Sequence, residues 1–168
     1  MPPPAIVKFP HPALRAPARA VSAVDDDLRA LTDGMIAAMR AAGGVGLAAP
    51  QVARPVRLIV AAAAENAAPL VFFNPKITAA AAEIAEREEG CLSMPGISAV
   101  VRRPAAVTVS GIDRDGGEFR ADAEGLLAAC LQHEIDHLNG VLFVDHLSRL
   151  KKNRLLAKYR KLSDGRGV

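Results

Sequence analysis

Residues 124–139 read Glu124-Gly-Leu-Leu-Ala-Ala-Cys-Leu-Gln-His-Glu-Ile-Asp-His-Leu-Asn139, and they carry the strongest structural signal in this 168-residue chain. Leucine and isoleucine recur at helical spacing, and a glycine follows at position 140, so the stretch predicts one helix. His133 and His137 are four residues apart and share one helix face, where both imidazoles can reach the same metal ion. Glu134 can approach a water molecule on that ion without binding the ion itself. The pattern predicts a metal site on a helix.

The third ligand of this predicted site is not fixed by spacing. A catalytic metal site normally has three protein ligands and leaves one position for water. The candidates are Cys91, Cys130, a distant carboxylate or another histidine. Cys130 precedes His133 by three residues and lies near the same helix face. Such a cysteine is, however, more often a buried thiol that binds no metal. Cys91 follows Gly90 and precedes the turn signal Pro95-Gly96, so it could reach the helix from a separate strand.

Two further helices and a central group of strands are predicted. Acidic residues at 25–27 favour the start of a helix that ends at Gly43-Gly44, and another helix covers about 148–162. The strands lie between about 56 and 122 and include a hairpin turn at 113–117. Residues 79–89 are ambiguous, because alanine and glutamate favour a helix whereas the neighbouring segments favour strands. Helices at both ends with strands between them predict an α+β fold, in a single domain over residues 1–168.

The net charge of +3 is unevenly distributed and excludes some classes of partner. Residues 145–168 hold eight lysine or arginine residues and two acidic ones, so the rest of the chain is slightly acidic. This argues against DNA as a partner but leaves room for a local contact with a polyanion. The apolar run at 58–64 is far shorter than the roughly 20 residues that span a membrane. With no signal-peptide pattern and only two cysteines, we expect a cytoplasmic protein that binds no membrane.

Three segments together resemble the peptide deformylase family. They are Gly44-Val-Gly-Leu-Ala-Ala-Pro-Gln51, Glu89-Gly-Cys-Leu-Ser93 and Gln132-His-Glu-Ile-Asp-His-Leu138. Residues 6–15 and 142–148 are also similar to bacterial members, so the resemblance covers nearly the whole chain. It implies an α+β fold in which mixed or antiparallel sheets pack around the central metal-bearing helix, between an N-terminal and a C-terminal helix. It also implies that residues 79–89 are largely strand.

The resemblance implies a reaction and a metal. The family removes formate from the N-formylmethionine that begins newly made bacterial polypeptides, so the implied partners are nascent N-formylmethionyl peptides. Cys91 is implied as the third ligand beside His133 and His137. One divalent ion is implied, with Fe(II) as the native metal, although zinc, nickel or cobalt can occupy the site. The donor set alone would favour zinc.

Further roles follow from the same resemblance. Glu134 is implied as the general base, and the Gln51 amide and the Leu92 backbone N–H are implied as donors to the oxyanion. Ala129 is smaller than the isoleucine often found in the family, and Ser98 replaces a larger polar residue, often arginine. These departures predict a roomier pocket and changed contacts with the peptide beyond methionine. The implied substrate contacts are Gly44, Val45, Gly46, Glu89, Gly90, Leu126, Ala129, Cys130 and His133.

Alternative interpretations stay open at this point. A peptidase of the His-Glu-x-x-His type would share the helix and Glu134, but it usually takes a third histidine or a glutamate as ligand. A ribosome-associated binding module would keep a structural metal enclosed by four protein ligands. The basic C-terminal helix is either a solvated face or a contact with ribosomal RNA. His11 and His146 lie outside the three segments and are expected to be surface or turn histidines.

Overall fold

The computed structural model describes residues 2–64 and 66–165. The predicted domain of residues 1–168 therefore includes a few positions, namely 1, 65 and 166–168, that lie outside the described residues. The α-helices in the described ranges are α1 (Asp26–Ala41), α2 (Gly125–Leu138) and α3 (Arg149–Gly165). Short 3-10 helices are η1 (Pro12–Leu14), η2 (Ala49–Val52) and η3 (Phe143–His146). The strands are β1 (Gly46–Ala48), β2 (Leu58–Ala61), β3 (Leu70–Ala80), β4 (Ile84–Gly90), β5 (Ser98–Pro104), β6 (Ala106–Ile112) and β7 (Glu118–Glu124).

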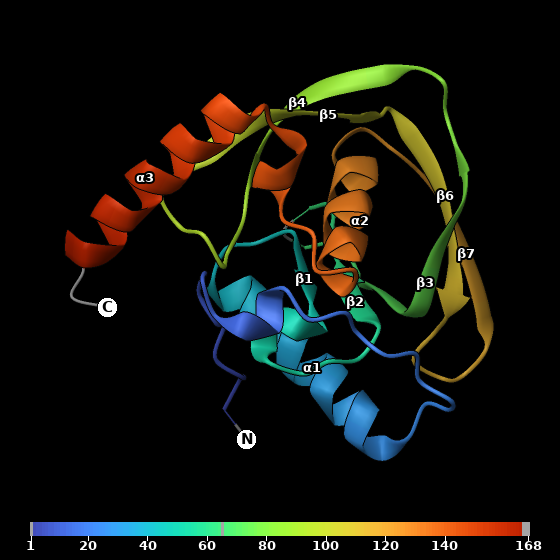
Figure 1. Ribbon diagram of the computed structural model, residues 1–168. Helices are drawn as coiled ribbons and strands as arrows, with labels where there is room; N and C mark the ends of the chain where they lie inside the picture. Colours follow the sequence, from blue (N-terminus) through green and yellow to red (C-terminus); the bar gives the residue numbers. More distant parts are fainter. Residues whose placement is uncertain (1, 65, 166–168) are drawn as a thin grey trace.

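The strands form two sheets around α2. One sheet has five strands in the order β1-β2-β3-β6-β7, and the other is the β4-β5 pair. All these pairings are antiparallel. Figure 1 shows α2 in the middle, with β4 and β5 across one end, β3, β6 and β7 along one side, and α1 below. The predicted α+β class with sheets packed around a central helix is confirmed.

The first helix begins and ends where its sequence predicts. The Asp25 side chain accepts a hydrogen bond from the Leu28 backbone N at 2.8 Å and so caps the first turn. Gly43 then has a φ of +70°, a backbone conformation that residues other than glycine rarely adopt. Leu28, Leu31, Met35 and Met39 are buried against β1 and β2. Periodicity and capping together therefore fix α1.

Residues 79–89 are largely strand, which settles the ambiguity left by composition. β4 pairs with β5 along its whole length, from Ile84 opposite Pro104 to Gly90 opposite Ser98. Glu86 lies opposite Arg102 and forms an ion pair with it at 3.5 Å. Such a cross-strand pair stabilises a sheet, so the partner strand outweighs the helical preference of alanine and glutamate. The strand β5 itself had not been predicted.

The hairpin between β6 and β7 is confirmed. Ile112 pairs with Glu118, and the intervening turn is held by Asp113, whose Oδ1 accepts from the backbone N of Asp115 and of Gly117 at 2.9 Å. Such side-chain to backbone bonds are the usual reason for aspartate in tight turns. The hairpin ends at Glu124, so β7 leads directly into α2. The chain thereby places the start of α2 at the edge of the larger sheet.

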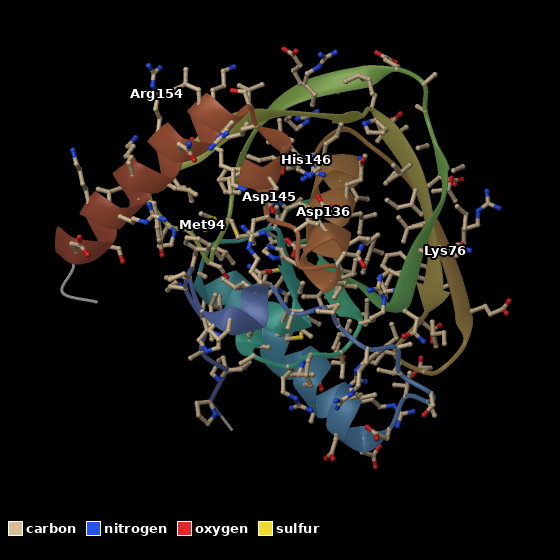
Figure 2. The ribbon with its side chains drawn as sticks, in the orientation of Figure 1. Lys76, Met94, Asp136, Asp145, His146 and Arg154 are labelled. Carbon is tan, nitrogen blue, oxygen red and sulfur yellow. The ribbon has the colours of Figure 1, made fainter. Side chains whose placement is uncertain are left out.

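The C-terminal helix α3 stands out from the body of the molecule (Figure 1). It begins at Arg149 and runs to Gly165, slightly further than the predicted 148–162. Leu156 and Tyr159 are its buried residues, and the Tyr159 hydroxyl donates to the Phe9 carbonyl at 2.9 Å. Figure 2 shows Arg154 pointing away from the protein. Within the described ranges, the helices all lack the combination of length and apolar character that a membrane crossing requires.

A candidate metal centre

Three side chains meet at the centre of the molecule. Cys91 directly follows β4, whereas His133 and His137 lie one turn apart on α2. The two Nε2 atoms are 3.2 Å apart, and Cys91 Sγ lies 3.4 Å from His137 Nε2. One donor atom from each residue falls within 4.8 Å of the others. The structure therefore brings together the three residues that the resemblance implied as metal ligands.

The geometry of these donors fits a tetrahedral metal. Typical bonds of about 2.05 Å to nitrogen and 2.3 Å to sulfur separate two nitrogen ligands by about 3.3 Å, and nitrogen from sulfur by about 3.6 Å. The observed separations of 3.2 Å and 3.4 Å agree with these values. Burial lowers the pKa of His137 well below its usual range, and the neutral ring is the form of histidine that binds a metal.

Cys130 occupies a different place. Its thiol donates to the Val45 carbonyl, with Sγ and O 3.4 Å apart. Burial, together with the negative charge of Glu134, raises the pKa of this thiol well above its usual range, so it stays protonated. The choice between the two cysteines, which helix spacing could not make, depends on the fold. Cys91 faces the histidines from outside the helix, and Cys130 forms part of a cavity wall.

A buried charge network supports His133 from behind. Glu89 Oε1 lies 3.0 Å from His133 Nδ1, and Arg103 donates to both Glu89 oxygens at 2.6 Å and 3.0 Å. Arg103 also donates to Asp136 at 2.9 Å. Although burial alone would raise the pKa of Glu89, the bonds from His133 and Arg103 lower it to about 2, so the carboxylate is charged. A carboxylate on the second ring nitrogen orients a ligating histidine and strengthens its binding.

This network contains two residues that the sequence analysis considered and one that it did not. Glu89 was expected to contact substrate; it lines the cavity described below, and its carboxylate is bonded to His133 and Arg103. His146 was expected to be a surface or turn histidine, and it is exposed in the short helix η3, where its Nε2 lies 2.8 Å from Asp136 Oδ2 (Figure 2). Arg103 was not singled out at all. Its partners are 14 and 33 positions away, so no local pattern marks it.

Glu134 lies beside the donor triad in a tightly packed position. It is 4% exposed, and its Oε2 has no hydrogen-bond partner within the described residues. Burial raises the pKa of Glu134 to about 7. A Cβ added to Gly46 would lie 2.7 Å from Glu134 Oε1, so only glycine leaves room for this carboxylate. A buried carboxyl group with a pKa near neutrality can both accept and return a proton.

Gln51 and Leu92 lie next to Cys91. The Gln51 side-chain oxygen accepts from the Ala48 backbone N at 2.9 Å, which turns its Nε2 toward Cys91 Sγ at 3.5 Å and Ser93 Oγ at 3.2 Å. Gln51 is 1% exposed, so its amide is held in one orientation. Leu92 follows Cys91, and a Cβ on Gly44 would approach its Cδ1 to 2.6 Å. The first glycine of the predicted segment therefore allows Leu92 to pack closely.

A cavity of about 400 Å³ opens onto this site. Val45 and Leu126 are half-exposed at 39% and 44%, as expected for apolar residues that line an open cavity. Sequence reasoning missed several lining residues, among them Arg87, Met94 and Ile97. The lining residues that it did predict are Gly44, Val45, Gly46, Gln51, Glu89, Gly90, Cys91, Leu92, Leu126, Ala129, Cys130, His133 and Glu134.

A cysteine and two histidines around one point, with a buried carboxylate beside them and an open apolar cavity, define a metal-dependent hydrolase. The sequence profile described as polypeptide deformylase matches residues 3–153. The chain therefore belongs to the polypeptide deformylase family.

Individual relatives cover nearly the whole chain. A peptide deformylase of Rhizobium meliloti (strain 1021) is 47% identical over 166 residues, which are 97% of this chain and 95% of the relative. Among solved structures, a peptide deformylase from Ehrlichia chaffeensis superposes with a TM-score of 0.92 at 36% identity, covering 98% of both chains. A peptide deformylase from Synechococcus elongatus in complex with actinonin has a TM-score of 0.88 at 47% identity, covering 94% of this chain and 88% of that one.

Proposed function

We propose that this chain removes the formyl group from the N-terminal N-formylmethionine of newly synthesised polypeptides and releases formate. The observation that carries the proposal is the convergence of Cys91, His133 and His137 beside the buried carboxylate of Glu134. Family membership and the relatives named peptide deformylase support the same reaction. We further propose that residues 1–168 form one catalytic domain that works in the cytoplasm on nascent peptides, with no role for DNA or a membrane.

The proposed metal ligands are Cys91, His133 and His137. A divalent ion held there would supply a Lewis acid that lowers the pKa of a water molecule toward neutrality. We propose Fe(II) as the native ion, with zinc, nickel or cobalt able to replace it. The donor set supports a divalent metal in general, and the choice of iron rests on the resemblance to the family.

Glu134 is proposed as the general base and acid. Its unpartnered Oε2 is free to accept the proton that water loses as it attacks the formyl carbon. The raised pKa then allows Glu134 to return the proton to the methionine nitrogen as the C–N bond breaks. Without this protonation, the nitrogen would have to leave as an unstable amide anion. The C–N bond is thus replaced by formate and a free amine.

Gln51 and Leu92 are proposed to stabilise the oxyanion. The bond from the Ala48 backbone N fixes the Gln51 oxygen and leaves its Nε2 directed at the space beside Cys91. The backbone N–H of Leu92, directly after Cys91, would add a second donor. Each such donor is typically worth about 3 kcal/mol in the transition state because it is already oriented before the reaction.

The cavity walls suit an unbranched apolar side chain. Val45, Leu126, Ala129 and Cys130 line it within reach of the metal centre. An extra or missing methylene in such a pocket changes binding by about 1–3 kcal/mol, so these walls favour methionine over shorter residues. Ser98 does not line this cavity; its hydroxyl donates to Glu88 at 2.6 Å. We propose that Gly44, Gly46 and Gly90 let the peptide backbone approach closely.

The exposed basic face of α3 is proposed to contact ribosomal RNA. Lys151, Arg154 and Lys158 are all exposed, whereas Leu156 and Tyr159 attach the helix to the core. Replacing the three basic residues by glutamine should weaken co-sedimentation with ribosomes, and binding by the unchanged chain should fall steeply with salt. Unchanged co-sedimentation of the variant would remove this role and leave the enzymatic proposal intact.

One experiment tests the enzymatic proposal as a whole. The protein is purified anaerobically, and its metal content and its release of formate from a formyl-methionyl peptide are measured on the same sample. Anaerobic handling protects the Cys91 thiolate from oxidation. We expect about one metal ion per chain and formate release with no cleavage of internal peptide bonds. Cleavage of internal bonds, or a metal-loaded protein without formate release, would contradict the proposal.

A further inference from the structure

The cavity carries a positive charge at its far end. Arg87 lies on β4 two residues before Glu89, and alternate residues of a strand face the same side, so it faces α2 as Glu89 does. It lines the cavity, although its own surface is exposed. A Cβ added to Gly125 would lie 3.7 Å from Arg87 Nη2, which places the guanidinium beside the first turn of α2.

The distance along α2 shows what this guanidinium can reach. Gly125, Ala129 and His133 are spaced four residues apart and therefore share one helix face. At 1.5 Å per residue, Gly125 lies about 12 Å from His133 along the axis. In an extended formyl-methionine, the sulfur is five bonds of roughly 1.5 Å from the formyl carbon and lies about 6 Å away from it. A sulfur–oxygen bond of about 1.5 Å and a hydrogen bond of about 2.9 Å bring this reach to roughly 10.5 Å, close to the level of Gly125 where the guanidinium lies.

Ala129 keeps this region open. Its side chain lies between the main cavity and a second void of about 10 Å³, which Arg87, Glu89 and Gly125 also line. A void of that size is close to the volume that one water molecule occupies. Because alanine ends at Cβ, it fills less of the cavity wall near Arg87 than a larger side chain would.

Arg87 also lacks a partner of its own. In residues 2–64 and 66–165 its guanidinium makes neither an ion pair nor a hydrogen bond, whereas Arg102 pairs with Glu86 and Arg103 pairs with Glu89. A guanidinium offers five N–H donors, and a thioether sulfur accepts hydrogen bonds only weakly. A sulfoxide oxygen is a much stronger acceptor. Arg87 is therefore placed to distinguish an oxidised methionine from an unoxidised one.

We propose that Arg87 is a specificity-determining residue that enables the chain to deformylate peptides whose first residue is methionine sulfoxide, in addition to those that begin with methionine. This inference rests on the proposed deformylation. Methionine sulfoxide arises by oxidation of the thioether before binding. The reaction itself is unchanged, because water cleaves the formyl C–N bond, formate leaves, and the sulfoxide is neither formed nor reduced.

The test compares two formyl tripeptides that differ only in the oxidation of methionine, with kcat/KM for formate release as the readout. In the unchanged protein both peptides are substrates. In Arg87→Met, the ratio of kcat/KM for sulfoxide to that for methionine falls by about tenfold or more, because a charged hydrogen bond is lost. Arg102→Met removes an arginine from the neighbouring strand and is the matched control; there the ratio stays within about twofold.

Two more variants separate the explanations. Arg87→Lys keeps a charged donor, so its sulfoxide-to-methionine ratio of kcat/KM should lie between those of Arg87→Met and the unchanged protein. Ala129→Ile narrows the cavity near Arg87 and should lower kcat/KM for the sulfoxide peptide more than for the methionine peptide. No turnover of the sulfoxide peptide, or equal ratios in Arg87→Met and the unchanged protein, would overturn the inference while deformylation stands. No formate from the methionine peptide in a metal-loaded sample would instead contradict the proposed function itself.

Discussion

Replacing Gly46 by alanine tests the placement of the Glu134 carboxylate. The added Cβ would lie 2.7 Å from Glu134 Oε1 and 2.5 Å from Cys130 Sγ. To restore an ordinary contact of roughly 3.5 Å, the carboxylate must move by about 0.8 Å. A displacement of about 1 Å at a catalytic group can cost about a hundredfold in rate, or about 2.7 kcal/mol. We expect kcat/KM for formate release to fall by about that factor, with the metal retained.

The control for this substitution is a second glycine of the same cavity. A Cβ on Gly90 would meet only the Ile97 carbonyl, at an ordinary 3.4 Å. Gly90→Ala should therefore lose less than about threefold in kcat, whatever crowding of the peptide does to KM, since no catalytic group has to move. Both variants are assayed by formate release on anaerobically prepared protein after metal analysis and thermal melting. If fully metal-loaded Gly46→Ala kept its activity within threefold of the unchanged protein, the packing argument for Glu134 would be refuted.

Three further predictions concern charged side chains. Glu134→Gln should bind metal normally but lose about 10²–10⁴ in kcat, measured by formate release beside metal analysis; near-normal turnover would exclude it as the base. Arg103→Met should lower metal affinity by about 10–100-fold in a chelator competition, because Glu89 loses its partner and no longer orients His133. An unchanged metal affinity in this variant would show that metal binding does not need the network. Burial raises the pKa of Asp145, but bonds from Arg15 and Lys152 outweigh it and hold that pKa well below its usual range. Its contribution to the free energy of unfolding is therefore complete above about pH 4 and is lost as the pH falls further, so Asp145→Asn should flatten that dependence in urea titrations. If the free energy of unfolding of the variant fell as steeply with acid as that of the unchanged protein, Asp145 would not be the source of this pH dependence.

The elements that the sequence predicts correctly are those with local signals. The stripe from Leu127 to Leu138 and the Asp25 cap depend only on neighbours within a few residues, and both helices form as predicted. The hairpin at Asp113 likewise carries its own turn chemistry. Local periodicity and capping are therefore sufficient for these parts of the fold.

The parts that the sequence leaves open depend on distant partners. The strand character of residues 84–89 depends on pairing with β5, and the short run Ser98–Pro104 shows no clear alternation of its own. Helix spacing permits Cys130 as a ligand and does not bear on Cys91, so only the position of the chain after β4 decides between them. Arg103 matters through contacts with Glu89 and Asp136, which no pattern along the chain indicates. Such long-range contacts become visible only when the fold is known.

The central claim is that one sulfur and two ring nitrogens of this chain bind the same metal ion. X-ray absorption at the metal edge of the anaerobically loaded protein measures this directly, and Cys91→Ser serves as the matched variant. The account predicts one sulfur neighbour at about 2.3 Å and nitrogen neighbours at about 2.1 Å, with the sulfur lost in Cys91→Ser. A spectrum without sulfur in the unchanged protein, or with sulfur retained in Cys91→Ser, would contradict it.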